Sequence, residues 1–135
     1  MDIEISTDSD RLDLDMIHRW LSEESYWAQG RPREMMQHSF DNSICFGVYL
    51  GDRQVGFARV VTDRATFAWL ADVFILDEYR GRGYGKALVA AVLAHPELQG
   101  LRRWLLATKD AHGLYAQNGF TPVPDGRFME RLISR

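Results

Sequence analysis

A short run of glycines and cations is the clearest candidate for chemistry in the sequence. The residues Arg80-Gly81-Arg82-Gly83-Tyr84-Gly85-Lys86, called here the glycine loop, follow an apolar stretch and precede a segment with helical spacing. Glycines allow positive φ and let a ligand approach the backbone, and the N–H groups at a helix start attract anions. The sequence therefore predicts that the glycine loop holds a phosphate or pyrophosphate.

The glycine loop does not match the common phosphate-binding patterns. A P-loop has Ser or Thr after its lysine, whereas Ala87 follows Lys86. A dinucleotide-binding fingerprint needs a third glycine where Lys86 stands, and a protein-kinase loop belongs to a far larger chain. What remains is an Arg-x-x-Gly-x-Gly pattern between a strand and a helix.

The elements around the glycine loop are typical of an α+β fold. Alternation and β-forming residues predict strands near 3–6, 44–50, 54–61, 66–75, 103–108, 120–123 and 128–133. Helical spacing and capping residues predict helices near 13–21, 33–40, 83–94 and 111–118. We expect a mixed, mostly antiparallel central sheet of six to seven strands flanked by about four helices.

Length and composition limit the class of protein. A chain of 135 residues with 46% hydrophobic residues predicts a single domain over residues 1–135 with one core. The single cysteine, Cys45, excludes an internal disulfide and a cysteine-based zinc cluster, so we expect it to fill the core. No apolar run approaches the about 20 residues of a membrane helix, and no secretory signal is recognisable. We therefore expect a cytoplasmic protein with no metal and no membrane partner.

The charge of the chain is unevenly distributed. Residues 1–27 hold eight acidic side chains and two arginines, whereas residues 77–109 hold six cations and three acids. The basic zone includes the glycine loop and suits an anionic cofactor. The acidic zone could attract a cationic partner or could be solvated surface. Because the chain lacks a broad basic face, we expect no nucleic-acid partner.

Two motifs resemble those of the GNAT superfamily of N-acetyltransferases. The segment 80–85 is similar to the acetyl-CoA loop of that family. The segment 108–120 resembles its second signature, in which Ala, Leu-Tyr and Gly-Phe recur at the spacing of Ala111, Leu114-Tyr115 and Gly119-Phe120. The order of elements matches over most of the chain. The resemblance implies direct transfer of acetyl from acetyl-CoA to an amine in a ternary complex, between two strands that splay apart.

The resemblance also implies which residues hold the cofactor. The pantetheine arm would pair with strand backbone near Val73 and Ile75, and the pyrophosphate would lie on N–H groups of the glycine loop. The expected acetyl-CoA-binding residues are Val73, Phe74, Ile75, Arg80, Gly81, Arg82, Gly83, Tyr84, Gly85, Lys86, Thr108 and Tyr115. Many members carry Asn where this chain has Thr108, which leaves open how the pantetheine amide is held.

Amide formation from a thioester requires a deprotonated amine, a donor to the oxyanion and a proton for the departing thiolate. The resemblance implies that Tyr115 gives this proton. The alternative is an aromatic side chain that packs beside the cofactor sulfur without moving a proton. A main-chain N–H near Phe74 or Ile75 would serve the oxyanion.

The general base is an open assignment. Asp72 is a carboxylate in an apolar strand, where burial without a partner would raise its pKa; a structural carboxylate bonded to backbone or arginine is the alternative. By strand alternation, Asp72 would share a face with Leu70 and Phe74. Asp110 and His112 are further candidates, although Asp110 is also the expected helix N-cap.

The acceptor site is expected near Glu24, Tyr26 and Trp27, where carboxylates and aromatic rings together suit a cationic amine. The alternative is a packed loop with exposed acids. Trp69 and Arg33 are weaker candidates for the same pocket. The expected partner is a small-molecule or peptide amine, and the protein is expected to be a monomer or homodimer. A non-catalytic module that senses acyl-CoA is the alternative function.

Overall fold

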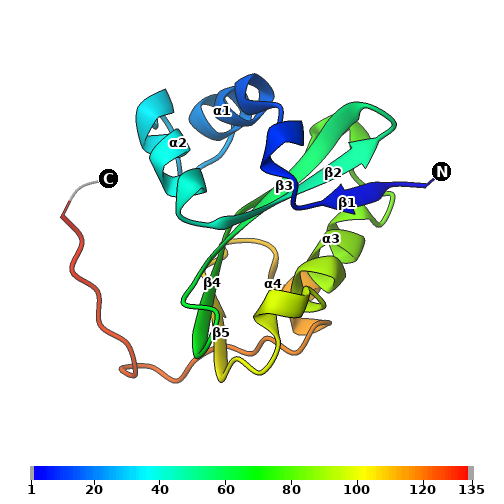
Figure 1. The fold of residues 1–135 in the computed structure, drawn as a ribbon. Coiled ribbons are helices and arrows are strands. Elements are labelled where there is room, and N and C mark those ends of the chain that lie inside the picture. The colour runs from blue at the N-terminus through cyan, green and yellow to red at the C-terminus, as the bar shows by residue number, and fades with distance from the viewer. Residues whose placement is uncertain (1, 134–135) are drawn as a thin grey trace.

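The computed structural model describes residues 2–133, and a five-stranded sheet runs through its centre (Figure 1). Its strands, in spatial order, are β1 (Glu4–Ser6), β2 (Ile44–Leu50), β3 (Arg53–Thr62), β4 (Phe67–Ile75) and β5 (Arg103–Leu106). β1 to β4 pair antiparallel, and β5 runs parallel to β4. A mixed, mostly antiparallel sheet in an α+β fold is thus confirmed.

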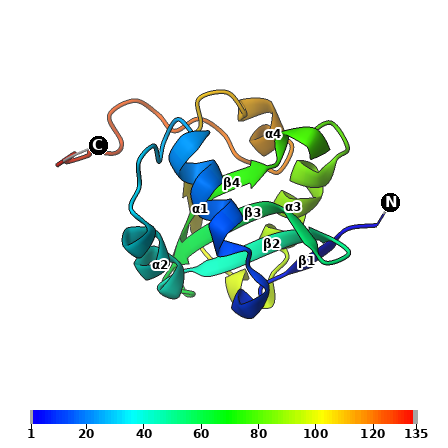
Figure 2. The ribbon, with the colours of Figure 1, turned by 90° about the horizontal axis from the view of Figure 1, so that it is seen from above.

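Helices cover both faces of this sheet (Figure 2). The α-helices of the described residues are α1 (Leu14–Glu23), α2 (Arg33–Asp41), α3 (Tyr84–Leu93) and α4 (His112–Ala116). Short 3-10 helices span Ser9–Arg11, Asp77–Tyr79 and Pro96–Leu98. α1 and α2 lie on one face, while α3 and α4 lie on the other (Figure 1). Each face has its own core, with Ile17 and Leu21 of α1 fully buried on one side and Leu88 and Val92 of α3 on the other.

A β-bulge interrupts β4 at Asp72. Phe57 pairs with Phe74 and Arg59 pairs with Ala71, so β4 has one residue more than β3 between these pairs. Asp72 takes a φ of 55°, a left-handed value that is uncommon for a residue other than glycine. The extra residue reverses the alternation of the strand, so Leu70 packs in the α3-side core and Phe74 in the α1-side core. The expectation that Asp72 shares one face with both Leu70 and Phe74 is therefore wrong.

The strands β4 and β5 form a ladder over only part of their length. Phe67 pairs with Arg103 at one end of the ladder and Leu70 pairs with Leu106 at the other, whereas β4 continues to Ile75. Beyond Leu70 the two strands separate, as the resemblance implied. Within residues 2–133, the backbone of β4 beyond Leu70 therefore has no strand neighbour on this side, and the chain after β5 turns into α4.

The expected count of six to seven strands is not confirmed. Residues 121–133 are exposed and contain neither helix nor strand, so the strands expected near 120–123 and 128–133 are absent from the described chain. A strand is stable only when a neighbour completes its hydrogen bonds, and Pro122 and Pro124 have no N–H to offer. Within residues 2–133, no helix is both long enough and apolar enough to cross a membrane.

Candidate functional site

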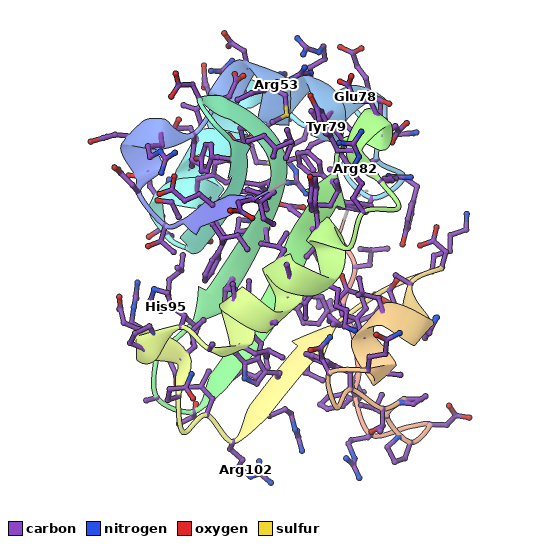
Figure 3. All side chains as sticks on the ribbon, turned by 90° about the vertical axis from the view of Figure 1, so that its right-hand side faces the viewer. Arg53, Glu78, Tyr79, Arg82, His95 and Arg102 are labelled. Carbon is purple, nitrogen blue, oxygen red and sulfur yellow. The ribbon has the colours of Figure 1, made fainter. Side chains whose placement is uncertain are left out.

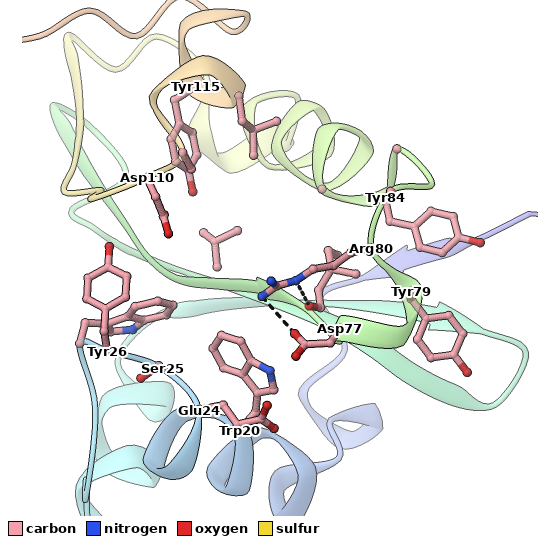
Figure 4. Close-up of a pocket in the computed structure, with 18 residues that line it drawn as sticks. Trp20, Glu24, Ser25, Tyr26, Asp77, Tyr79, Arg80, Tyr84, Asp110 and Tyr115 are labelled. Atoms are coloured by element: carbon pink, nitrogen blue, oxygen red, sulfur yellow. Dashed lines mark hydrogen bonds and ion pairs between the residues drawn. The ribbon is translucent and has the colours of Figure 1, made fainter.

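The part of β4 that continues beyond its ladder with β5 lines a cavity of about 610 Å³, called here the first cavity (Figure 4). Its lining combines the end of α1 and the following loop, the last part of β4, the glycine loop and α4. These residues are Trp20, Glu24, Ser25, Tyr26, Trp27, Val73, Ile75, Asp77, Tyr79, Arg80, Gly81, Gly83, Tyr84, Gly85, Asp110, Ala111, Leu114 and Tyr115. The structure therefore brings the two sequence motifs, 80–85 and 108–120, to one site.

The glycine loop forms an uncapped helix start. Gly81 and Gly83 have φ values of 80° and 83°, which explains the need for glycine at both positions. Gly83 is the N-cap of α3, and no side chain accepts a hydrogen bond from the first turn. By contrast, Asp13 caps α1 by accepting from the Met16 N–H. The first N–H groups of α3 are thus available to an anion, and the lining of the first cavity fits the pyrophosphate of CoA.

Among the cations of the glycine loop, Arg80 lines the first cavity. Its Nε donates to the Ile75 carbonyl at 3.2 Å, and its Nη2 lies 3.3 Å from the Asp77 carboxylate. Arg82 instead lies over the ring of Tyr79, with Arg53 and Glu78 nearby (Figure 3). Neither Arg82 nor the exposed Lys86 lines the first cavity.

Four other residues expected to bind the cofactor are divided between the first cavity and places outside it. The side chain of Phe74 stacks on Trp20 at 4.2 Å between ring centroids in the α1-side core, which leaves only its backbone near the opening. Val73 and Ile75 do line the first cavity. Thr108 lies outside it, and its Oγ1 accepts a hydrogen bond from the Ala111 N–H at 3.0 Å.

A second cavity, of about 500 Å³, lies beside the first. The residues common to both linings are Tyr26, Trp27, Val73, Asp110, Ala111 and Tyr115. The second cavity adds side chains from the α1–α2 connection, β3, β4 and the loop after β5: Arg31, Arg59, Trp69, Asp72, Thr108 and Lys109. Two ligands bound in the two cavities would therefore meet beside Tyr115.

Tyr115 is a buried side chain at the junction of the two cavities, with 8% of its surface exposed. Burial raises the pKa of Tyr115 to about 12, with smaller contributions from the nearby Tyr26 and Asp110. The phenol therefore keeps its proton at neutral pH and can donate it. Figure 4 shows Tyr115 and Asp110 pointing into the cavity from the α4 side, opposite Tyr26.

Asp72 is held by three donors. Trp27 Nε1 donates to Oδ1 at 2.8 Å, and Arg31 Nη1 and Arg59 Nε approach Oδ2 at 3.0 and 2.9 Å. Burial alone would raise the pKa of Asp72, but Arg59 and Arg31 outweigh it and lower that pKa. The expectation of a raised pKa is wrong, because the charge has two partners. A carboxylate in this state is a poor base, so the structural alternative describes Asp72 better.

Asp110, a further candidate for the base, is an exposed side chain. It does not cap α4, whose N-cap is Ala111 without a side-chain hydrogen bond, so the expected capping role is wrong. Instead, Asp110 lines both cavities near Tyr115. His112 is exposed and lines neither cavity.

The residues expected to bind the acceptor are divided between the cavities. Tyr26 and Trp27 line both, and Tyr26 Oη accepts from the Lys109 N–H at 2.9 Å. Glu24 is exposed and lines the first cavity but not the second. Trp69 lines the second cavity, whereas Arg33 pairs with Asp15 outside both.

Sequence reasoning missed Arg31, Arg59 and Lys109 as residues of the second cavity. A signal existed for Arg59, because it is a charged residue in an apolar strand close in sequence to the strand that carries Asp72. Arg31 comes from the α1–α2 connection, 41 positions from Asp72, and no local pattern predicts that contact.

Cys45 does not belong to the site. It is buried in the α1-side core, and burial raises the pKa of its thiol to about 12. In the described chain, 2–133, no group of three or more His, Cys, Asp or Glu side chains is arranged to hold a metal ion.

Comparisons with known proteins show the family to which this chain is related. The model of the acetyltransferase (GNAT) family matches residues 14–120. A crystal structure of a protein assigned to that family, from Xanthomonas campestris pv. campestris, is 54% identical and superimposes with a TM-score of 0.95, covering 98% of this chain and 94% of that one. A Gibberella zeae relative, provisionally named an acetyltransferase, is 33% identical over 136 residues, covering 84% of this chain and 76% of the relative.

A more distant structure shows the same fold with ligands. The N-acetylglutamate synthase of Neisseria gonorrhoeae, in complex with coenzyme A and N-acetyl-glutamate, is 17% identical with a TM-score of 0.72. The match covers 95% of this chain and 30% of that protein. The family model and the close relatives, rather than this distant likeness, carry the assignment. This chain belongs to the acetyltransferase (GNAT) family, which supports acyl transfer from acetyl-CoA.

Proposed function

We propose that the protein transfers the acetyl group of acetyl-CoA to a primary amine by direct attack in a ternary complex. The observation that carries the proposal is the junction of two cavities at Tyr115. One cavity contains the uncapped helix start and suits the cofactor. The other lies beside it and has room for an acceptor, so both substrates can be bound at once.

The residues of the first cavity would hold the cofactor. The N–H groups at the start of α3, with Arg80, would bind the pyrophosphate, and the unpaired backbone of β4 at Val73 and Ile75 would bind the amides of the pantetheine arm. When bound, acetyl-CoA supplies an activated acetyl group as a thioester.

Two side chains at the junction would move protons. As the C–N bond forms and the C–S bond breaks, Asp110 would accept a proton from the amine and Tyr115 Oη would give a proton to the sulfur. The pKa of about 12 for Tyr115 keeps that proton in place until sulfur leaves. A main-chain N–H near Phe74 or Ile75 remains the predicted donor to the carbonyl oxygen.

The test is acceptor-dependent release of free CoA. The purified protein is incubated with acetyl-CoA and a panel of primary amines, and the new thiol is titrated with an aromatic disulfide reagent. Cys45, the only cysteine, is buried and will not obscure the signal. We expect release above the hydrolysis background with at least one amine and detection of its acetylated form. If CoA raises the melting temperature but no amine increases release, the sensor alternative replaces the proposal.

A further inference from the structure

The second cavity has an unusual charge balance for a site that takes an amine. Its lining contains three cations, Arg31, Arg59 and Lys109, and two carboxylates, Asp72 and Asp110. In the proposed function, Asp110 faces the reacting amine. The remaining charges are three cations and one carboxylate, so cations outnumber carboxylates among them.

Asp72 neutralises only one of the two arginines that it contacts. Arg31 and Arg59 share its Oδ2, and their side chains are 19% and 14% exposed, whereas that of Asp72 is 1% exposed. One positive charge is thus left over in a region with little water. An excess charge in such a place is costly unless a ligand of opposite charge completes it.

The two guanidinium groups have donors to spare. Each carries five N–H groups in a plane. Arg31 uses Nη1 on Asp72; Arg59 uses Nε on Asp72 and Nη1 on Ser43 Oγ at 3.2 Å. Both side chains line the cavity, so donors on them can reach a ligand there. Planar donors of this kind fit a carboxylate or phosphate better than a lysine does.

We propose that the acceptor of this acetyltransferase carries an anionic group, a carboxylate or a phosphate, which binds Arg31 and Arg59 while its amine reaches Asp110 and Tyr115. This inference rests on the proposed function and specifies its substrate class. The aromatic ring of Trp69, 36% exposed beside the arginines, would cover the part of the acceptor between its two ends. The charges of this cavity therefore favour an acceptor that carries an anionic group, rather than a second cation, at the end away from its amino group.

The experiment compares amines that differ only at the far end. β-Alanine, γ-aminobutyrate and ε-aminocaproate are each tested against the amino alcohol and the diamine of the same length, with phosphoethanolamine against ethanolamine as the phosphate arm. The readout is kcat/KM for thiol release. We expect the carboxylate or the phosphate member to exceed its uncharged partner by at least about tenfold, as for one charged hydrogen bond.

The variant Arg31→Gln removes the excess charge and leaves Arg59 paired with Asp72. It should reduce the preference for the anionic amine over its amino alcohol by about tenfold, mainly through a higher KM for the anionic amine. Arg33→Gln is the matched control, because Arg33 lies two positions away and pairs with Asp15 outside the cavity. Thermal melting of both variants checks that each is folded.

The outcomes separate this inference from the function on which it rests. Equal or better turnover of amino alcohols or diamines would overturn the anionic acceptor and leave the acetyltransferase intact. If Arg31→Gln kept the full preference for anionic amines, Arg31 would not be the residue that binds the anionic group. Failure of every amine while CoA still binds would instead overturn the proposed function.

Discussion

Replacing Asp72 by asparagine distinguishes a carboxylate that holds two arginines from a catalytic base. Asparagine keeps the shape of the side chain but leaves Arg31 and Arg59 without a counter-charge. Removing one partner of a buried ion pair costs about 3–5 kcal/mol. Because the two arginines stay 19% and 14% exposed, we expect the lower end of that range, a loss of about 3 kcal/mol in the free energy of unfolding.

The same variant should change how stability depends on pH. The pKa of Asp72 is lowered in the folded protein, and its value in the unfolded chain is about 3.9. A group of this kind stabilises the fold fully above its unfolded pKa and loses that contribution as the pH falls through its folded pKa. The wild type should therefore lose stability below about pH 4, and Asp72→Asn should lack this part of the loss.

Urea unfolding followed by tryptophan fluorescence measures both effects, at pH 7 and in a series toward lower pH. Asp15→Asn is the control, because the Asp15 side chain is 85% exposed in its pair with Arg33. We expect that control to stay within about 0.5 kcal/mol of the wild type. If Asp72→Asn were as stable as the wild type but lost turnover at unchanged CoA affinity, Asp72 would be the base and the structural role would be refuted.

Further predictions concern the glycine loop and the cysteine. Gly83→Ala should weaken CoA binding measured by calorimetry by about tenfold. Alanine at φ 83° costs about 1–2 kcal/mol, and the loop relieves this strain by leaving the conformation that presents its N–H groups to an anion. Gly51→Ala, at φ 58° between β2 and β3 and outside the first cavity, should stay within about twofold; equal affinity of the two variants would remove the helix start from the site. Arg80→Gln should weaken CoA binding more than Arg82→Gln, since Arg80 lines the first cavity; the reverse order would place the phosphates elsewhere. Cys45 should react with a thiol reagent only after unfolding, and Cys45→Ala should keep full turnover; loss of turnover would give the thiol a role that its burial argues against.

Local patterns predicted the central part of this fold well. The strands before the glycine loop and the helix after it depend on residues that are close in sequence, such as the apolar run of β4 and the spacing of Leu88 and Val92. The helix start at the glycine loop could be predicted for the same reason. Its uncapped start and positive φ values are encoded by the glycines themselves.

Features that depend on distant contacts could not be predicted in this way. In a regular strand every second side chain lies on the same face of the sheet. The extra residue of the bulge at Asp72 breaks this rule, so Leu70 and Phe74 lie on opposite faces. The lowered pKa of Asp72 comes from Arg59 and Arg31, and only the tertiary fold brings Arg31 near. The segment 121–133 has a strand-like pattern at its end but pairs with no strand of the described chain. Such a pairing depends on distant residues and cannot be read from a local pattern.

Tyr115 has the central role in the proposed reaction, as the proton donor at the junction of the two cavities. The most direct test measures kcat for thiol release and CoA affinity for the wild type and for Tyr115→Phe, with the amine that the panel identifies as acceptor. We predict that kcat falls by about 100-fold or more, the usual contribution of a general acid, while the calorimetric Kd for CoA changes by less than about twofold. An unchanged kcat in Tyr115→Phe would show that Tyr115 does not give the proton to the departing sulfur.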